Sequence, residues 1–234
     1  DIARLVGYEE LERTPLCSIE SVVAMKDLNP QMKVSSQILE RFLSQGFVEC
    51  IHFSFTSPEL EKKLNSNARD FVEIENPIHS EKSVLRKNLL PQLLDRARAN
   101  AFQYEEDIRL VEVGPVFGTS NATIYEESPF SETRRIACVW LPRPVDEKRL
   151  WMRASMDPFF EFKGWIEKVW RGVDVALGFS LEGFENVLHP RRRIDFRYGV
   201  AGELHPALAQ AFDLPGRCFV AEWVMDAQIQ KRHY

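Results

Sequence analysis

The sequence has little of what marks a membrane protein, a disulfide-rich protein or a zinc protein. Its longest wholly apolar run, Ile136 to Leu141, is far short of the roughly 20 residues that span a bilayer. The four cysteines, Cys17, Cys50, Cys138 and Cys218, form no Cys-x-x-Cys pair, so neither a zinc site nor a redox dithiol is indicated. The P-loop, the nucleophile elbow and the His-Glu-x-x-His motif are also absent from the sequence.

The sequence also lacks a surplus of basic residues. Lys and Arg total 30 against 35 Asp and Glu, which gives a formal net charge of −5. Proteins that neutralise many phosphates usually carry a positive charge, so net charge disfavours nucleic-acid binding and leaves room only for a local basic patch. The composition is 44% hydrophobic and 28% charged, which excludes disorder as the main state of the chain.

The distribution of cysteines predicts inert thiols in a reducing cytosol. Cys50, Cys138 and Cys218 occur within apolar runs typical of strands, where a cysteine usually acts as a small buried hydrophobe. We therefore expect a cytoplasmic protein.

The chain divides into a short lead and a long body. Residues 1–15 resemble the end of a helix that Gly7 terminates, followed by a polar linker, and we interpret them as the tail of a preceding domain. Residues 16–234 form the body. The sequence therefore looks like a segment of a longer chain.

The body alternates irregularly between helical and strand patterns. A helix is expected from Pro30 to Gln45, ended by Gly46, and others over 58–64, from about Asn88 with Pro91 in the first turn, from Pro158, and over 206–212. Strands are expected over 47–55, 71–76, 107–117, 134–141, 193–199 and 217–225. Because the strands lack a regular alternation with helices, the pattern predicts an α+β fold with a mixed or antiparallel sheet flanked by helices.

Five stretches in this order resemble one family: SQGFVECIHFSFTSP, ENPIHSEKSVLRKNLLPQLLDRARAN, IRLVEVGPVF, FFEFKGWIE and GELHPALAQAFDL. They are similar to the C-terminal half of the β subunit of bacterial phenylalanyl-tRNA synthetases. The resemblance implies a class II aminoacyl-tRNA synthetase fold in a subunit that performs no chemistry. It also implies a heterotetramer with the catalytic α subunit, which holds the ATP and magnesium used to attach phenylalanine to its tRNA.

We next ask whether the chain has the residues that adenylate formation needs. This reaction requires cationic groups on the ATP phosphates. In class II synthetases these are an Arg on the second motif's strand and an Arg in a glycine-rich third motif. Here LVEVGPVF has Glu112 but no Arg, and GELHPALAQAF has neither the Arg nor the glycines. We therefore expect no catalytic residue, cofactor site or metal site in this chain. The alternative is a free-standing ATP-dependent ligase that activates a carboxylate on the same fold.

Three further groups of residues each allow a functional and a structural reading. His189-Pro190 and His205-Pro206, with Glu203 nearby, suggest metal ligands or an acid–base pair, but a His-Pro pair more often marks a turn or a helix start. The run Arg191, Arg192 and Arg193 is a candidate contact for tRNA phosphates, or a solvated strand end.

The third group lies on the helix from Pro30 to Gln45, which resembles the long first-motif helix that forms the dimer interface of class II folds. Its row Val34, Ile38 and Phe42 is the candidate partner interface. The structural alternative is that the whole apolar stripe packs within the chain.

Overall fold

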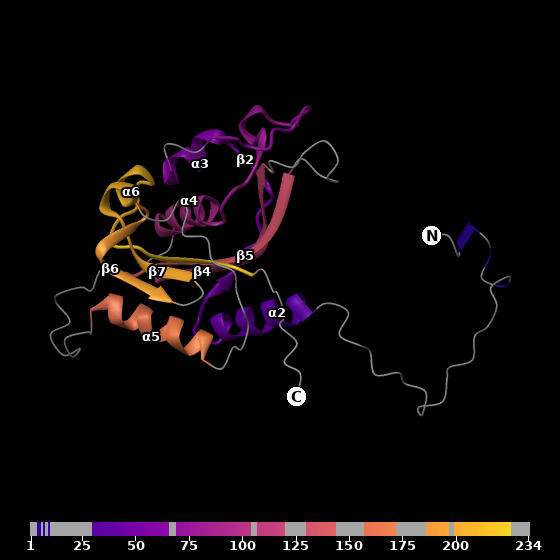
Figure 1. The fold of residues 1–234 in the computed structure, drawn as a ribbon. Coiled ribbons are helices and arrows are strands. Elements are labelled where there is room, and N and C mark those ends of the chain that lie inside the picture. The colour runs from indigo at the N-terminus through magenta and orange to yellow at the C-terminus, as the bar shows by residue number, and fades with distance from the viewer. Residues whose placement is uncertain are drawn as a thin grey trace, which may run out of the picture.

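One six-stranded sheet with helices on both faces forms the body of the protein, as Figure 1 shows for the computed structural model. The structure describes residues 4–5, 7, 9, 30–65, 69–103, 107–119, 130–143, 157–171, 186–196 and 199–225. The strand order is β1-β4-β5-β8-β7-β6. The strands are β1 (Val48–Glu49), β4 (Ile108–Thr119), β5 (Phe130–Leu141), β8 (Phe219–Val224), β7 (Gly199–Leu204) and β6 (Leu188–Phe196).

The sheet is mixed, because β1 pairs parallel with β4 and every other neighbouring pair is antiparallel. A separate two-stranded sheet joins β2 (Phe55–Thr56) to β3 (Val84–Leu85). This architecture confirms the predicted α+β class.

The alternation of side chains along β5 divides the interior into two hydrophobic cores. Ile136, Cys138 and Trp140 point to one face, and Ala137, Val139 and Leu141 point to the other. Helices α2 (Pro30–Leu43) and α5 (Pro158–Trp170) cover the first face. On the second face lie α3 (Pro58–Leu64), α4 (Leu90–Ala101) and α6 (Pro206–Ala211) (Figure 1). The short 3-10 helix η2 (Ser80–Lys82) contacts β2. Both faces of β5 are therefore buried from Ile136 to Leu141.

Three helix starts follow their predicted local signals. Pro91 lies in the first turn of α4, and the leucine and alanine stripe of that helix is buried throughout. The Asp157 side chain caps α5 by accepting a hydrogen bond from the Phe159 N–H at 2.9 Å. The His205 side chain caps α6 in the same way, at 3.2 Å from the Ala207 nitrogen. Of the two His-Pro pairs, this one therefore marks a helix start, as predicted.

The strand prediction was wrong at several positions. The expected strand over 47–55 is reduced to β1 and part of β2, because the chain leaves the sheet after Cys50, and the His52 N–H bonds the Glu112 side chain rather than a strand neighbour. In the segment 71–76 only Glu73 forms a bridge, to Val84. Strand β7 was missed, and β6 begins earlier than expected, so His189-Pro190 lies in a strand with an irregular register and not in a turn.

The candidate interface on α2 also needs correction. Ile38 and Phe42 are fully buried in the core between α2, α5 and the sheet, and Val34 is half-buried against it. The structural alternative therefore holds for this row, because the chain's own sheet occupies these side chains.

The predictions for residues 1–15 fall almost entirely on positions outside the described residues, as does Cys17. No helix in the described part of the chain combines the length and apolarity that crossing a membrane requires.

We predict that Ile38→Ala lowers the free energy of unfolding by roughly 2 to 5 kcal/mol, because it leaves a cavity in a fully buried site. Urea denaturation measures this change. Gln37→Ala, on the exposed side of the same helix, should change it by less than about 0.5 kcal/mol. Equal effects of the two substitutions would mean that α2 does not pack as described.

Candidate functional site

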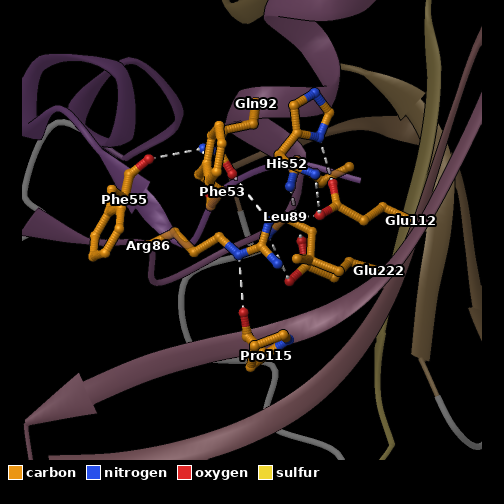
Figure 2. A network of polar contacts seen from close by, with 10 residues as sticks. His52, Phe53, Phe55, Arg86, Leu89, Gln92, Glu112, Pro115 and Glu222 are labelled. Atoms are coloured by element: carbon orange, nitrogen blue, oxygen red, sulfur yellow. Dashed lines mark hydrogen bonds and ion pairs between the residues drawn. The ribbon is translucent and has the colours of Figure 1, made fainter. Parts of the chain in front are cut away.

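Glu112, on β4, is the centre of a buried polar network beside α4, drawn in Figure 2. Its Oε1 accepts a hydrogen bond from Arg86 Nη1 at 2.6 Å, and its Oε2 lies 2.6 Å from His52 Nδ1. The Glu112 and Arg86 side chains are each 2% exposed. Burial alone would raise the pKa of Glu112, but the hydrogen bonds and charges of His52 and Arg86 outweigh it and lower that pKa. Glu112 is therefore held as a carboxylate.

Arg86 donates hydrogen bonds within the chain from both Nε and Nη1. Besides Glu112, it donates from Nε to the Pro115 carbonyl at 2.9 Å and from Nη1 to Gln92 Oε1 at 3.0 Å (Figure 2). A Cβ added at Gly114 would collide with Arg86 Nη2, so a larger residue at this position would displace the guanidinium group. The absence of a side chain at Gly114 leaves space on β4 for the Arg86 guanidinium.

A second buried carboxylate, Glu222 on β8, accepts hydrogen bonds from the backbone at the start of α4. The backbone N–H groups of Leu89 and Leu90 both donate to it at 3.4 Å. Arg135 on β5 donates to Glu222 at 2.9 Å and to Asn88 Oδ1 at 3.0 Å. The two arginines of this network, Arg86 and Arg135, are thus each neutralised by a buried carboxylate.

An open cleft of about 760 Å³ lies between residues 51–60 and the outer side of α4. Ile51 and Phe53, on its wall, are 87% and 72% exposed. A smaller apolar hollow of about 380 Å³ adjoins it and shares Phe53, Phe55 and Lys82 with it. Apolar side chains of this size at high exposure are typical of contact surfaces. We call Ile51, Phe53, Phe55 and Ile78 the apolar ridge.

The other predicted site residues have local roles. Glu203 binds Arg217 at 2.7 Å and Arg192 at 3.0 Å, while Nδ1 of His189 accepts from the Arg191 backbone and that of His205 caps α6. Among the residues that the structure describes, no group of three His, Cys, Asp or Glu side chains could hold a metal ion. In the basic run, Arg191 and Arg193 are exposed, and Arg192 is engaged with Glu203.

In the sequence, Glu112 stands out only because an arginine is missing from its strand, and no motif connects it to its neighbours in the structure, His52, Arg86, Gln92 and Glu222. One signal was available. Glu112 and Glu222 interrupt otherwise apolar strand patterns, and a charged side chain at a core position needs a buried partner.

A family model described as "Phenylalanyl tRNA synthetase beta chain CLM domain" matches residues 18–225. Curated relatives include the phenylalanine–tRNA ligase β subunits of Syntrophus aciditrophicus, 29% identical over 97% of this chain, and of Legionella pneumophila, 26% identical over 92%. The chain spans only 28% and 26% of the length of these relatives. A solved pyrrolysyl-tRNA synthetase from Desulfitobacterium hafniense has a TM-score of 0.60 at 12% identity, covering 88% of this chain and 70% of that one, and shows the same fold.

We predict that Glu112→Gln destabilises the protein by about 3 kcal/mol at pH 7, because it leaves the Arg86 charge buried without a counter-ion. The lowered pKa of Glu112 stabilises the fold above its unfolded value of 4.5, and this stabilisation is lost as pH falls through the folded value. The difference from the parent should therefore shrink in acid. Urea denaturation at pH 7 and pH 3.5 measures it.

The matched control is Glu132→Gln, on the exposed end of β5. It should be near neutral at both pH values. A Glu112→Gln difference that stays the same at both pH values would contradict the proposed charge pairing.

Proposed function

Because the chain belongs to the phenylalanyl-tRNA synthetase β chain family, we propose that it is a non-catalytic module of that subunit which supports the catalytic α subunit. In this role it is the class II synthetase-like core of the C-terminal half of the β subunit. The whole assembly would join phenylalanine to its tRNA, with ATP and magnesium held by the α subunit in the cytoplasm. The relatives carry the β-subunit name, which favours this reading over a free-standing ligase.

The observation that carries the proposal is the neutralisation of two arginines beside α4, the buried Arg86 and the half-buried Arg135. An enzyme that forms adenylates needs cations free to stabilise charge on phosphorus. Arg86 and Arg135 are instead paired with Glu112 and Glu222 at 2.6 and 2.9 Å. In addition, the leucine stripe of α4 packs directly on the sheet in one continuous core. Both features support a scaffold more than a nucleotide site.

The apolar ridge is the surface that we assign to the α subunit. Ile51 and Phe53 lie in the segment after β1, Phe55 begins β2, and Ile78 lies in the loop before η2. It replaces the row Val34, Ile38 and Phe42, whose last two members are already buried. An exposed row of large apolar side chains costs solubility in a free chain, and a partner removes that cost.

Contact with tRNA is a separate part of the proposal and concerns the basic run on β6. Arg191 and Arg193 are exposed on this edge strand of the sheet, where phosphates have access. Arg192, bound to Glu203, is the least suited of the three.

We predict that the isolated chain does not bind ATP in the presence of magnesium and does not exchange pyrophosphate with phenylalanine. The reason is that its buried cations already have carboxylate partners. Isothermal titration calorimetry measures the binding. Micromolar affinity for ATP would overturn the non-catalytic assignment and favour the ligase.

We predict that Phe53→Ser weakens binding to the α subunit from the same organism by at least about tenfold, since aromatic anchors carry much of an interface's binding energy. Phe102→Ser is the matched control, because Phe102 is similarly exposed but lies at the end of α4, outside the ridge. Co-purification and titration with the α subunit measure the effect.

Both variants should melt within a few degrees of the parent, because neither side chain is buried. If the two variants bind equally well, the α subunit docks elsewhere. If the parent itself does not bind, the proposed pairing fails altogether.

A further inference from the structure

Glu61 is a buried acid that the proposed function does not use. It lies on α3 and is 1% exposed. Among the described residues its carboxyl oxygens accept no hydrogen bond of good geometry, and the donors near them are the Lys87 backbone and the Asn88 side chain. On the same helix Leu64 is buried in the α4-side core, and Leu60 packs against that core. The face that docks α3 therefore presents a carboxyl group to the interior.

The surroundings of Glu61 disfavour a charge on it. Burial and the nearby Glu222 carboxylate raise the pKa of Glu61 to about 8, against the smaller opposing effects of the Lys87 backbone, the Asn88 side chain and Arg86. Arg86 and Arg135 offer little relief, because they are bound to Glu112 and Glu222 respectively.

Among the described residues, Glu222 and Arg86 are the charged groups that act on Glu61; Asp95 and Arg96 of α4 lie on the cleft side, beside Leu60. Helix α6 has the sequence PALAQA, without a titratable side chain. On α3 itself, Lys62 and Lys63 are exposed, and Lys63 lies over the Phe212 ring at 5.5 Å. A deprotonated Glu61 would thus be a buried charge beside a second buried carboxylate, which is unfavourable.

We propose that Glu61 is a proton-operated latch: α3 docks against the start of α4 with this carboxyl protonated, and loss of the proton favours release of the helix. When α3 is released, the carboxyl enters water and ionises with its ordinary pKa of about 4.5. The inference goes beyond the proposed function and does not depend on it.

The sign of the effect follows from the two protonation states. Below about pH 4.5 the carboxyl is protonated in both states, so docking is strongest. Between about pH 5 and pH 8 only the docked state holds the proton, so the equilibrium constant for release rises up to tenfold per pH unit. Above about pH 8 the constant levels off.

The latch also has a structural consequence for the neighbouring cleft. The N-cap residue Ser57 and the first-turn residues Glu59 and Leu60 line the cleft, together with Ile51, Phe53 and Phe55 of the apolar ridge. Release of α3 would open that wall. Low pH therefore favours the docked position of α3 and a closed cleft, and a pH near 8 favours release of α3 and a more open cleft.

Hydrogen exchange in the 234-residue chain tests the latch. The reporter is the Asn65 N–H, which donates to the Glu61 carbonyl at 3.3 Å, and the reference is the Leu93 N–H in α4, which donates to the Leu89 carbonyl. After division by the intrinsic exchange rate, protection of Asn65 should fall by about 100-fold between pH 5.5 and 7.5, while that of Leu93 falls far less.

Two variants make the test specific. Glu61→Gln is neutral at every pH and should abolish the dependence, whereas Glu59→Gln, exposed on the same helix, should retain it. Carbon-13 NMR of the Glu61 side-chain carboxyl in the parent measures its titration directly. This measurement tests the proposal even if Glu61→Gln folds poorly.

Three outcomes would overturn the proposal. They are a carboxyl that titrates near 4.5, a pH dependence that persists in Glu61→Gln, and an equal loss of protection at Leu93, which would indicate global unfolding rather than release of α3.

Discussion

The contact between the Arg86 guanidinium and the Glu112 carboxylate fixes the position of α4 on the sheet. Arg86 precedes the helix by a few residues, and its backbone carbonyl also accepts a hydrogen bond from the Phe117 N–H at 2.8 Å. Main chain and side chain therefore both join this segment to β4. Removing two charges from water costs several kcal/mol per ion, and only a pair with further hydrogen bonds offsets it. The Pro115 carbonyl, Gln92 and His52 supply those hydrogen bonds to the charge pair.

Much of the fold could be predicted from local patterns. The leucine stripe of α4, the cap at Asp157 and the long strands β4 and β5 each have a signal within a dozen residues of sequence, and each is present in the structure. The segment over 47–55 shows the limit of such patterns. Alternation marks two sides of a chain, but it does not say whether either side is covered, and here Ile51 and Phe53 point into solvent. The same limit applies to Ile38, because a helical stripe does not reveal which partner buries it.

The polar network was not predictable from spacing. Arg86 and Glu112 are 26 residues apart, and Leu89 and Glu222 are 133 apart. Only the topology of the sheet brings β4 and β8 to the start of α4. The sequence does show a glutamate in each of two apolar strands. Such a residue indicates a buried partner, but the sequence does not show which residue that partner is.

The packing of β5 limits how this protein can change in length. Its residues from Ile136 to Leu141 alternate between two closed cores, so an inserted or deleted residue would exchange the two sets of side chains. Trp140 would then face the small site of Ala137 or Val139 beside α4, and an alanine would face the aromatic site beside α5. From Ile136 to Leu141 neither face of the strand is open to solvent, so neither set of side chains can be exchanged without loss. We therefore expect insertions and deletions in this family to accumulate in the connections between strands, and the length of β5 to remain constant among its members.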